Sequence, residues 1–281
     1  MGAEQGTLVS SEHLEVFQRN GVVCLRQVFD QKWLDLVAVG IARNLSAPSA
    51  YAQHLKAGGD TGRFFGDYCN WRRIQEFRAF VYDSPAAALA AQLMSSEKVI
   101  FYHEHLLIKE PGTQKETPWH HDQPYYPIDG WQVCSMWMPL DPVPRTTCVQ
   151  FVKGSHRWGR WFVPRNFNDA RNYPFKDPCE RHSAGARFET VPDIAGHRED
   201  YDLLSWDLTP GDCLAFHMRT LHGALGNPSF TTSRRVLATR WVGDDARFTE
   251  RPWEISPPIT GGLRPGEHMA CEEFPVVWPR G

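Results

Sequence analysis

The segment Thr117-Pro-Trp-His-His-Asp-Gln-Pro-Tyr-Tyr126 contains a His-x-Asp sequence at residues 120–122. Residues two apart on an extended strand point to the same face, so His120 and Asp122 can present an imidazole and a carboxylate to one ion. His121 lies between them and is expected to face the other way. A metal site built on this pair needs a third ligand from a distant part of the chain.

A second segment supplies candidates for that ligand: Pro210-Gly-Asp-Cys-Leu-Ala-Phe-His-Met-Arg-Thr-Leu-His-Gly223. It offers His217 and His222. Two histidines and one carboxylate on one face of an octahedron form the facial triad of non-haem Fe(II) oxygenases, which leaves three positions open for co-substrate and dioxygen. The pair Arg234-Arg235 follows on the next predicted strand. One such guanidinium is suited to bind the carboxylate of a 2-oxo acid in bidentate fashion.

Each of these features has an ordinary structural explanation when it is taken alone. A His-x-Asp sequence occurs by chance in many proteins, and a histidine on a strand is usually a core or surface residue. Arg234 alone would be interpreted as a surface charge. Their combination, in the order His-x-Asp, Pro-Gly-Asp turn, histidine and arginine, favours a metal site.

Composition excludes several other classes of protein. The chain has 281 residues, of which 42% are hydrophobic and 22% are charged, as in globular proteins. Its net charge of −3 argues against a strongly basic nucleic-acid-binding protein. No apolar run approaches the roughly 20 residues of a membrane span, and the first residues do not form a signal peptide. Seven scattered cysteines without a Cys-x-x-Cys pair indicate a reduced, cytoplasmic chain.

The pattern of the chain changes from helical to extended near Lys98. Helices are predicted from Ser10 or Ser11 to Gly21, from Asp30 to about Ala42, and from Pro85 to Ser95. A short buried strand is predicted at Val22–Leu25. The other predicted strands, separated by Pro and Gly, are Val99–Lys109, Gln132–Met138, Cys148–Val152, Asp212–His217 and Val236–Val242. Short strands with such punctuation indicate a barrel or double sheet.

We predict one domain over residues 1–281, in four parts. A helical front covers about residues 8–97, and a β core covers about 98–245. The stretch of about 165–205 is polar and too long for a simple connection, so it is predicted to be a lid-like insertion. Residues 246–281 are rich in Pro and Gly and are predicted to wrap around the surface.

Four motifs together resemble the phytanoyl-CoA dioxygenase family of Fe(II)/2-oxoglutarate-dependent oxygenases, over about residues 8–245. They are F-x-x-x-G-V-V at Phe17–Val23, W-H-x-D-Q at Trp119–Gln123, Q-F-V-K-G-S-H at Gln150–His156, and the long motif at Pro210–Arg235. The resemblance implies a mainly β fold with flanking α-helices. Its core would be a double-stranded β-helix, a cupin-like jelly roll, packed by the N-terminal helices.

The resemblance also implies a ligand set, with His120, Asp122 and His222 binding iron. His222 is preferred to His217 because the family places its distal ligand in a His-Gly pair, followed by Asn and then Arg. Asn227 and the arginine pair fit that order.

By the same resemblance, Arg234 grips the C5 carboxylate of 2-oxoglutarate and Trp137 lies against this co-substrate. The interval from Asn227 to Arg234 is one residue longer than expected, which leaves Arg235 as an alternative. Neighbouring residues of a strand point to opposite faces, so only one of the two arginines serves.

The implied activity is hydroxylation of an aliphatic C–H bond of a small organic molecule. It would use Fe(II), 2-oxoglutarate and dioxygen, and release succinate and CO2. Alternatives are desaturation, a zinc hydrolase, a non-catalytic barrel that binds a metal or ligand, and halogenation. Halogenation is disfavoured because Asp122 fills the position that such halogenases leave for chloride. The sequence indicates neither the substrate nor the oligomeric state.

Two groups of residues are candidates for the substrate pocket. On the predicted strand Val99–Lys109, His103 and His105 share one face and Glu104 the other, and the sequence leaves open which face is inside. Arg72 and Arg73 are more consistent with surface positions. Several aromatic residues near the motifs suit an apolar substrate or a cation, or else pack the sheets together: Trp119, Tyr125, Tyr126, Trp131, Trp158 and Trp161.

Overall fold

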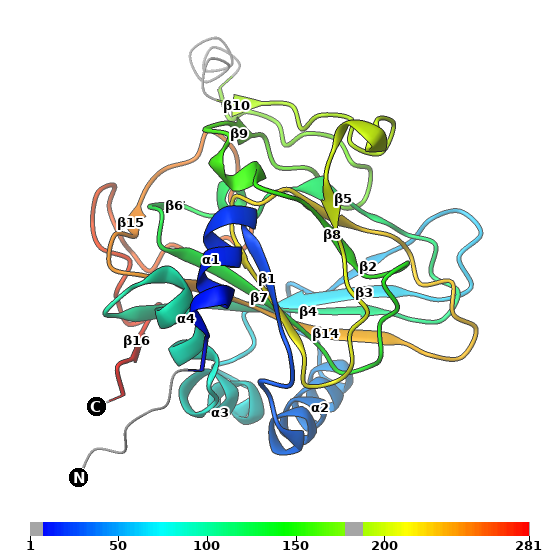
Figure 1. Cartoon of the computed structure of the whole chain (residues 1–281), viewed down its shortest axis with the longest axis horizontal. Helices are drawn as coiled ribbons and strands as arrows, with labels where there is room; N and C mark the ends of the chain where they lie inside the picture. The colour runs from blue at the N-terminus through cyan, green and yellow to red at the C-terminus, as the bar shows by residue number, and fades with distance from the viewer. Residues whose placement is uncertain (1–7, 178–187, 281) are drawn as a thin grey trace.

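Two antiparallel sheets pack against each other to form the core of the structure (Figure 1). The computed structural model describes residues 8–177 and 188–280. Within these residues the larger sheet has the order β2-β3-β4-β14-β7-β12-β1, with β16 also paired to β4. The smaller sheet has the order β5-β13-β8-β11. This arrangement confirms the predicted mainly β fold with a jelly-roll core.

The strands are short, and most end at the turns predicted from Pro and Gly. The larger sheet contains β1 (Val22–Leu25), β2 (Gln53–Leu55), β3 (Phe64–Tyr68), β4 (Val99–Lys109), β7 (Val133–Pro139), β12 (Cys213–His217), β14 (Arg234–Val242) and β16 (Val276–Trp278). The smaller sheet contains β5 (Thr117–His120), β8 (Val149–Val152), β11 (Leu203–Leu204) and β13 (His222–Ala224). Two small pairs complete the described strands: β9 (Trp161–Phe162) with β10 (Phe188–Glu189), and β6 (Ile128–Asp129) with β15 (Arg247–Phe248).

Helices cover the outer face of the larger sheet. They are α1 (Ser11–Asn20), α2 (Gln31–Ser46), α3 (Gln75–Asp83) and α4 (Ala86–Met94). In Figure 1, α2 and α3 lie below this sheet, whereas β5 and β8 of the smaller sheet lie above it. No helix within residues 8–177 and 188–280 has the length and apolar character needed to cross a membrane.

Alternation along the strands separates the two faces of the larger sheet. On β7, Met136 and Met138 pack toward the helices, whereas Trp137 packs toward the smaller sheet. On β14, Leu237 belongs to the helix-facing core and Val236 to the inner one. This period of two places every second side chain inside the jelly roll.

Sequence reasoning missed several elements at the two ends of the chain. The front contains a further helix, α3, and two strands, β2 and β3, that extend the larger sheet. All five residues of β3, Phe64–Tyr68, are buried, so the strand shows no polar alternation that would reveal it. The tail is more than a surface wrap, because Trp253 and Phe274 are fully buried and β16 pairs with β4.

The insertion predicted over about 165–205 contributes one strand to the smaller sheet and one to the β9–β10 pair. Its last part forms β11, which pairs with β8, and Phe188–Glu189 form β10. Residues 178–187 of this predicted insertion lie outside the described residues.

Asp212, in the Pro-Gly-Asp turn before β12, ties that strand to the end of β1. Its carboxylate accepts hydrogen bonds from the backbone N–H groups of Thr209 (3.0 Å) and Gln27 (3.1 Å) and from the guanidinium of Arg26 (2.8 Å). Burial alone would raise the pKa of Asp212, but these donors hold the pKa below its ordinary value. The turn also needs Gly211, whose φ is +98°.

We expect Asp212→Ala to lower the free energy of unfolding by about 2 to 3 kcal/mol at neutral pH, because several donors lose a buried, charged acceptor. Because the pKa of Asp212 is lower in the folded state, the difference from wild type should shrink as the pH falls below about 4. Chemical denaturation at several pH values measures both. The control is Asp202→Ala, which removes an exposed ion pair with Lys153 and should change stability little. An equal loss in both variants would contradict this role.

Candidate metal centre

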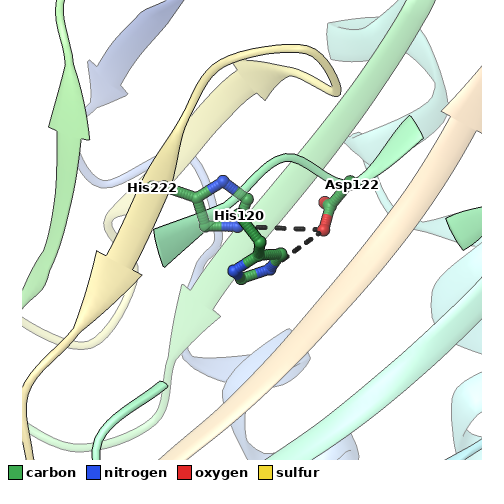
Figure 2. A group of neighbouring side chains, drawn as sticks. All are labelled: His120, Asp122 and His222. Atoms are coloured by element: carbon green, nitrogen blue, oxygen red, sulfur yellow. Dashed lines mark ion pairs between the residues drawn. The ribbon is translucent and has the colours of Figure 1, made fainter. Parts of the chain in front are cut away.

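Three potential metal ligands meet at one end of the smaller sheet. His120 ends β5 and His222 begins β13, and the antiparallel register places them directly opposite each other. Asp122 follows at the start of a short 3-10 turn, Gln123–Tyr125. One ligand atom from each residue lies within 4.8 Å of the others. Figure 2 shows both imidazoles beside the Asp122 carboxylate, with Nε2 of His120 at 3.6 Å and Nε2 of His222 at 3.8 Å from Oδ1.

Backbone carbonyls fix the tautomer of both histidines. Nδ1 of His120 lies 2.7 Å from the carbonyl of Pro118, and Nδ1 of His222 lies 2.9 Å from that of Thr220. A carbonyl oxygen only accepts, so each Nδ1 carries the proton. The lone pair of each Nε2 is therefore free to bind a metal. A hydrogen bond from the other ring nitrogen to a backbone carbonyl is usual for a histidine that binds a metal.

Asp122 is oriented by two donors on the other side of its carboxylate. Oδ2 accepts a hydrogen bond from the Ser135 hydroxyl (2.6 Å) and forms an ion pair with Arg240, whose Nε lies 2.9 Å away. Burial alone would raise the pKa of Asp122, but the Arg240 guanidinium holds that pKa well below its usual range. The carboxylate is thus ionised, with Oδ1 directed at the imidazoles.

This donor set fits an Fe(II) ion. All three residues are buried, and burial together with the neighbouring His120 lowers the pKa of His222 to about 3. Two imidazole nitrogens and one carboxylate oxygen are the 2-His-1-carboxylate set that non-haem iron uses. His217, the alternative candidate, points elsewhere, and so does His121, as expected from its place between His120 and Asp122. Nε2 of His121 accepts from the N–H of Phe162 (3.0 Å), and Nε2 of His217 lies 2.9 Å from the carbonyl of Trp131.

The His-Gly pair at the third ligand has a steric reason. A Cβ added to Gly223 would lie 3.1 Å from the Trp119 ring and 3.3 Å from the Thr117 carbonyl. Trp119 therefore packs under this glycine, and it belongs to the core cluster around Leu221. A residue with a side chain at this position would press β13 away from β5, the strand that carries His120.

A cavity of about 180 Å³ opens beside the three residues. Trp137 and Arg234 line it, as do Tyr125 and Tyr126 among the candidate aromatic residues. The other aromatic candidates and the two arginines Arg72 and Arg73 are not among the residues that line it. Trp119 packs under Gly223 as described, and Trp131 is 49% exposed. The others lie in separate clusters or at the surface: Trp158, Trp161, Arg72 and Arg73.

The two arginines of β14 point to opposite faces, as strand geometry requires. Arg234 is buried, and its guanidinium donates to the carbonyls of Leu225 (3.0 Å) and Thr147. Arg235 lies on the outer face and forms an ion pair of 2.7 Å with Asp141. Of the two, only Arg234 lines the cavity.

Sequence reasoning missed a second cation beside Arg234. Lys109 ends β4, is the Cα partner of Arg234 across the sheet, and lines the same cavity. It is buried, and its Nζ donates to the carbonyl of Leu225 (3.0 Å). Burial and the charge of Arg234 lower the pKa of Lys109 well below its ordinary value. A sequence signal for Lys109 was available. Lys109 lies an even number of residues after His103, His105 and Leu107, so all four side chains share the cavity face of one strand.

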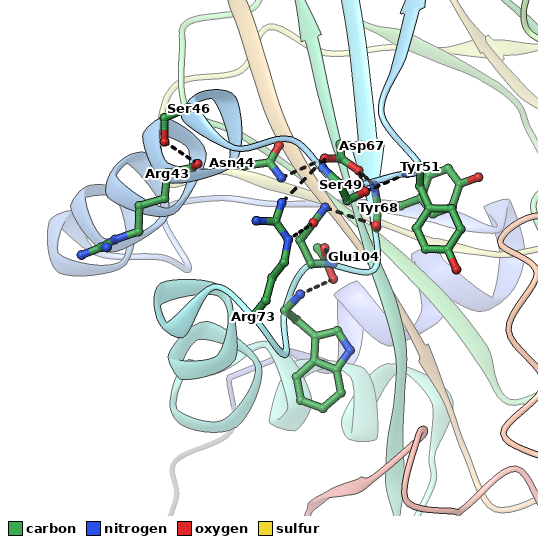
Figure 3. A network of polar contacts seen from close by, with 11 residues as sticks. Arg43, Asn44, Ser46, Ser49, Tyr51, Asp67, Tyr68, Arg73 and Glu104 are labelled. Atoms are coloured by element: carbon green, nitrogen blue, oxygen red, sulfur yellow. Dashed lines mark hydrogen bonds and ion pairs between the residues drawn. The ribbon is translucent and has the colours of Figure 1, made fainter.

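The outward face of β4 explains why His103 and His105 face the cavity. Glu104, between them, accepts hydrogen bonds from the backbone N–H groups of Asn70 and Trp71 (3.2 Å for Trp71). Figure 3 shows Glu104 within a polar network that also includes Asp67 of β3. Burial raises the pKa of Glu104 to about 8, against the lowering effect of these N–H donors. With Glu104 anchored outside, strand alternation places both histidines inside.

The fold and the triad define a class of protein: a double-stranded β-helix with a mononuclear facial-triad metal centre. The family model described as phytanoyl-CoA dioxygenase (PhyH) matches residues 17–236. The chain therefore belongs to this family, as the motifs indicated. It is a non-haem iron, 2-oxoglutarate-dependent oxygenase, and its cofactors are iron and 2-oxoglutarate, as predicted.

Solved structures of the same fold include enzymes with different reactions. The α-ketoglutarate-dependent carbocyclase SnoK from nogalamycin biosynthesis is 21% identical, with a TM-score of 0.71, and the match covers 96% of each chain. The epimerase SnoN, in complex with Fe3+, α-ketoglutarate and nogalamycin RO, is 19% identical, with a TM-score of 0.71 over 95% of this chain and 97% of SnoN. At these identities the likeness establishes the fold.

A third relative of this fold is EctD from S. alaskensis, in a structure with 2-oxoglutarate and 5-hydroxyectoine. It is 17% identical, with a TM-score of 0.66 over 97% of this chain and 89% of EctD. A comparison with curated proteins gives no match.

We expect Ser135→Ala to weaken Fe(II) binding about tenfold, because the ligating carboxylate loses the hydroxyl that orients it. Anaerobic equilibrium dialysis against Fe(II) measures this affinity. The control is Ser84→Ala, another fully buried serine, whose hydroxyl accepts a hydrogen bond from the N–H of Ala86. Unchanged affinity in Ser135→Ala, or an equal loss in both variants, would show that the Ser135 contact does not position the ligand.

Proposed function

We propose that this protein hydroxylates an aliphatic C–H bond of a small organic molecule, with release of succinate and CO2 from 2-oxoglutarate. The observation that carries the proposal is the buried group of His120, Asp122 and His222, which opens on a cavity that also contains Arg234. These are the parts that the chemistry requires: three ligands on one side of an ion, and a cation for the co-substrate.

In this proposal Nε2 of His120, Nε2 of His222 and Oδ1 of Asp122 hold the iron. Iron together with 2-oxoglutarate supplies the activation of dioxygen that oxidises the C–H bond. The chain keeps both imidazoles neutral through their backbone contacts. It keeps Asp122 ionised through Arg240 and Ser135, so that no ligand needs to lose a proton before the metal binds.

Arg234 and Lys109 are proposed to bind the distal carboxylate of 2-oxoglutarate. Burial penalises both positive charges, and it lowers the pKa of Arg234 to about 10. The hydrogen-bond acceptors found for these two cations are backbone carbonyls, and Lys109 also lies over the Phe64 ring, 4.6 Å from its centroid. Neither kind of contact neutralises the charge. A carboxylate placed between them would offset that penalty. Trp137, on the neighbouring strand, is proposed to lie against the carbon chain of the co-substrate.

The cavity walls are proposed to exclude water from the reaction. Aromatic rings stand beside the ligands, with Tyr125 at 5.6 Å and Phe167 at 4.9 Å from the His120 ring, centroid to centroid. Such walls bring an apolar C–H bond near the iron and keep reactive species away from solvent.

Asp122 weighs against the halogenase alternative, since the carboxylate occupies the position that a halide would need. The epimerase and carbocyclase activities of the structural relatives use the same cofactors, so the ligand set alone does not separate them from hydroxylation. The product separates these reactions. Incorporation of one oxygen atom from ¹⁸O2 into the product would support hydroxylation, whereas an oxidised, epimerised or cyclised product without label would contradict it.

The activity itself is tested by succinate formation. We expect the anaerobically iron-loaded protein to form succinate from 2-oxoglutarate on exposure to air, and faster with a compound from a panel of small acids, amines and neutral ring compounds. Asp122→Ala should abolish this, because the iron loses a ligand. Full activity in Asp122→Ala would contradict the ligand assignment. Bound iron without any succinate in the wild type would favour a binding protein.

The paired arginines allow a matched test of co-substrate binding. We expect Arg234→Met to weaken 2-oxoglutarate binding to the iron-loaded protein about 100-fold, because a buried charged contact is lost. Arg235→Met removes the same charge one residue away on the outer face, and binding should stay within about threefold of wild type. Anaerobic calorimetric titration with 2-oxoglutarate measures both affinities. A larger loss in Arg235→Met would reverse the assignment.

A further inference from the structure

Charge is distributed unevenly over the cavity. Apart from the histidines, the described residues that line it include four charged side chains: Lys109, Asp122, Arg234 and Arg240. Lys109 and Arg234 lie together at the ends of β4 and β14, and Asp122 and Arg240 are bound to each other. The other polar residues of the described lining are uncharged: Gln53, Tyr68, Thr117, Tyr125, Tyr126, Asn166, Asn168, Tyr173 and Ser256. The space left for a substrate therefore offers no partner for a strongly charged group.

One histidine in this space presents an unused hydrogen-bond acceptor. His103 lines the cavity and is 1% exposed. Its Nδ1 lies 3.0 Å from the carbonyl of Glu104 and therefore carries the proton, which leaves the lone pair on Nε2. In the described part of the chain, Nε2 has no hydrogen-bonding partner. Burial and the charge of Arg240 keep the pKa of His103 well below its ordinary value, so the ring is neutral.

A matching donor lies on the neighbouring strand. Arg240 is the Cα partner of His103 in the pairing of β14 with β4, and both side chains line the cavity. Nε of Arg240 is committed to Asp122 and Tyr126, whereas its Nη1 is buried and has no partner among residues 8–177 and 188–280. Two residues that line one cavity from adjacent strands thus each keep a buried nitrogen without a partner, one an acceptor and one a donor. A hydroxyl group satisfies both, since it donates one hydrogen bond and accepts another.

Part of the wall is aromatic, and its rings pack against one another. Tyr68 lines the cavity and is held from behind by Tyr51, whose ring stacks on it at 5.0 Å and 14°. Tyr173 packs edge-on against Tyr125 at 5.5 Å, and Phe167 packs against the same ring at 6.1 Å. Flat side chains fixed in this way are complementary to a flat or cyclic molecule, through ring contacts at the distances typical of aromatic pairs.

We propose that the substrate is an uncharged cyclic compound that carries a hydroxyl group, and that this hydroxyl donates a hydrogen bond to Nε2 of His103. The proposal rests on the proposed function, because it places this compound beside the iron ligands. His103 acts as a positioning residue: it orients the molecule and takes no part in the oxidation. Burying an acceptor without a partner is costly, so a compound that lacks the hydroxyl is rejected.

Binding of matched probes tests this without turnover. The probes are 2-naphthol, its O-methyl ether 2-methoxynaphthalene, and the anion 2-naphthoate. Equilibrium dialysis under nitrogen measures their affinities for the protein loaded with Fe(II) and 2-oxoglutarate. We expect wild type to bind 2-naphthol about tenfold more tightly than either of the other two. His103→Leu should lose the preference over the ether, and His103→Gln, whose amide oxygen is an acceptor, should recover part of it.

His105→Leu is the matched control, because His105 lies on the same strand and lines the same cavity. We expect it to weaken both neutral probes by a similar factor and to leave the preference for the hydroxyl in place. The proposal is overturned by an unchanged preference in His103→Leu, by a preference lost only in His105→Leu, or by equal binding of all probes to wild type. Failure of every probe to bind wild type also overturns it.

The same samples keep the two proposals apart. Iron and 2-oxoglutarate contents of the dialysed wild-type protein report the cofactor assignment directly. Absence of either from wild type would contradict the proposed function. Full loading of both, combined with no hydroxyl preference, would contradict only the role of His103. Thermal unfolding of each variant confirms that the compared proteins are folded.

Discussion

The pairing of β5 with β13 is the constraint on which the rest of the site depends. It sets His120 opposite His222, and each imidazole is then turned by a carbonyl only two residues before it in the chain. The geometry of both nitrogen ligands is therefore a property of the backbone of two short strands. Close packing of Trp119 under Gly223 holds these strands together, so a glycine that touches no metal still belongs to the metal site.

The buried charges at the two ends of the cavity are treated differently. At one end an anion and a cation pair with each other, whereas at the other end two cations lie together. Asp122 and Arg240 compensate each other, which allows a full carboxylate to stay ionised in the interior. Lys109 and Arg234 donate to backbone carbonyls, and Lys109 also lies over the Phe64 ring. Such contacts stabilise a cation without neutralising it. An enzyme that must bind a dicarboxylate gains from this asymmetry, because the anion relieves a penalty already present in the folded protein.

Much of this was predictable from local sequence, and the failures have physical causes. The His-x-Asp spacing and the alternation of Arg234 with Arg235 are consequences of strand geometry, which sequence displays directly. Lys109 was not recognised as a site residue, and whether His103 and His105 face inward stayed open. Deciding which face of β4 is inside requires knowing that Glu104 is anchored to Asn70 and Trp71. That contact joins residues more than thirty positions apart. The strand β3 was not predicted for a related reason. Both of its faces are buried, so its sequence lacks the alternation of polar and apolar residues that reveals a strand.

The division of labour between sheets and connecting segments explains how one fold serves several reactions. Ligands and cations stand on or directly beside paired strands, where register fixes them: His120 and His222 across one pair, Lys109 and Arg234 across another. Much of the aromatic wall instead comes from segments outside the two sheets, such as Tyr125, Phe167 and Tyr173. Loop segments vary without disturbing the ladder. Relatives that share about a fifth of their residues can thus keep the sheet-borne cofactor chemistry, while the shape of the wall decides which carbon is presented to it.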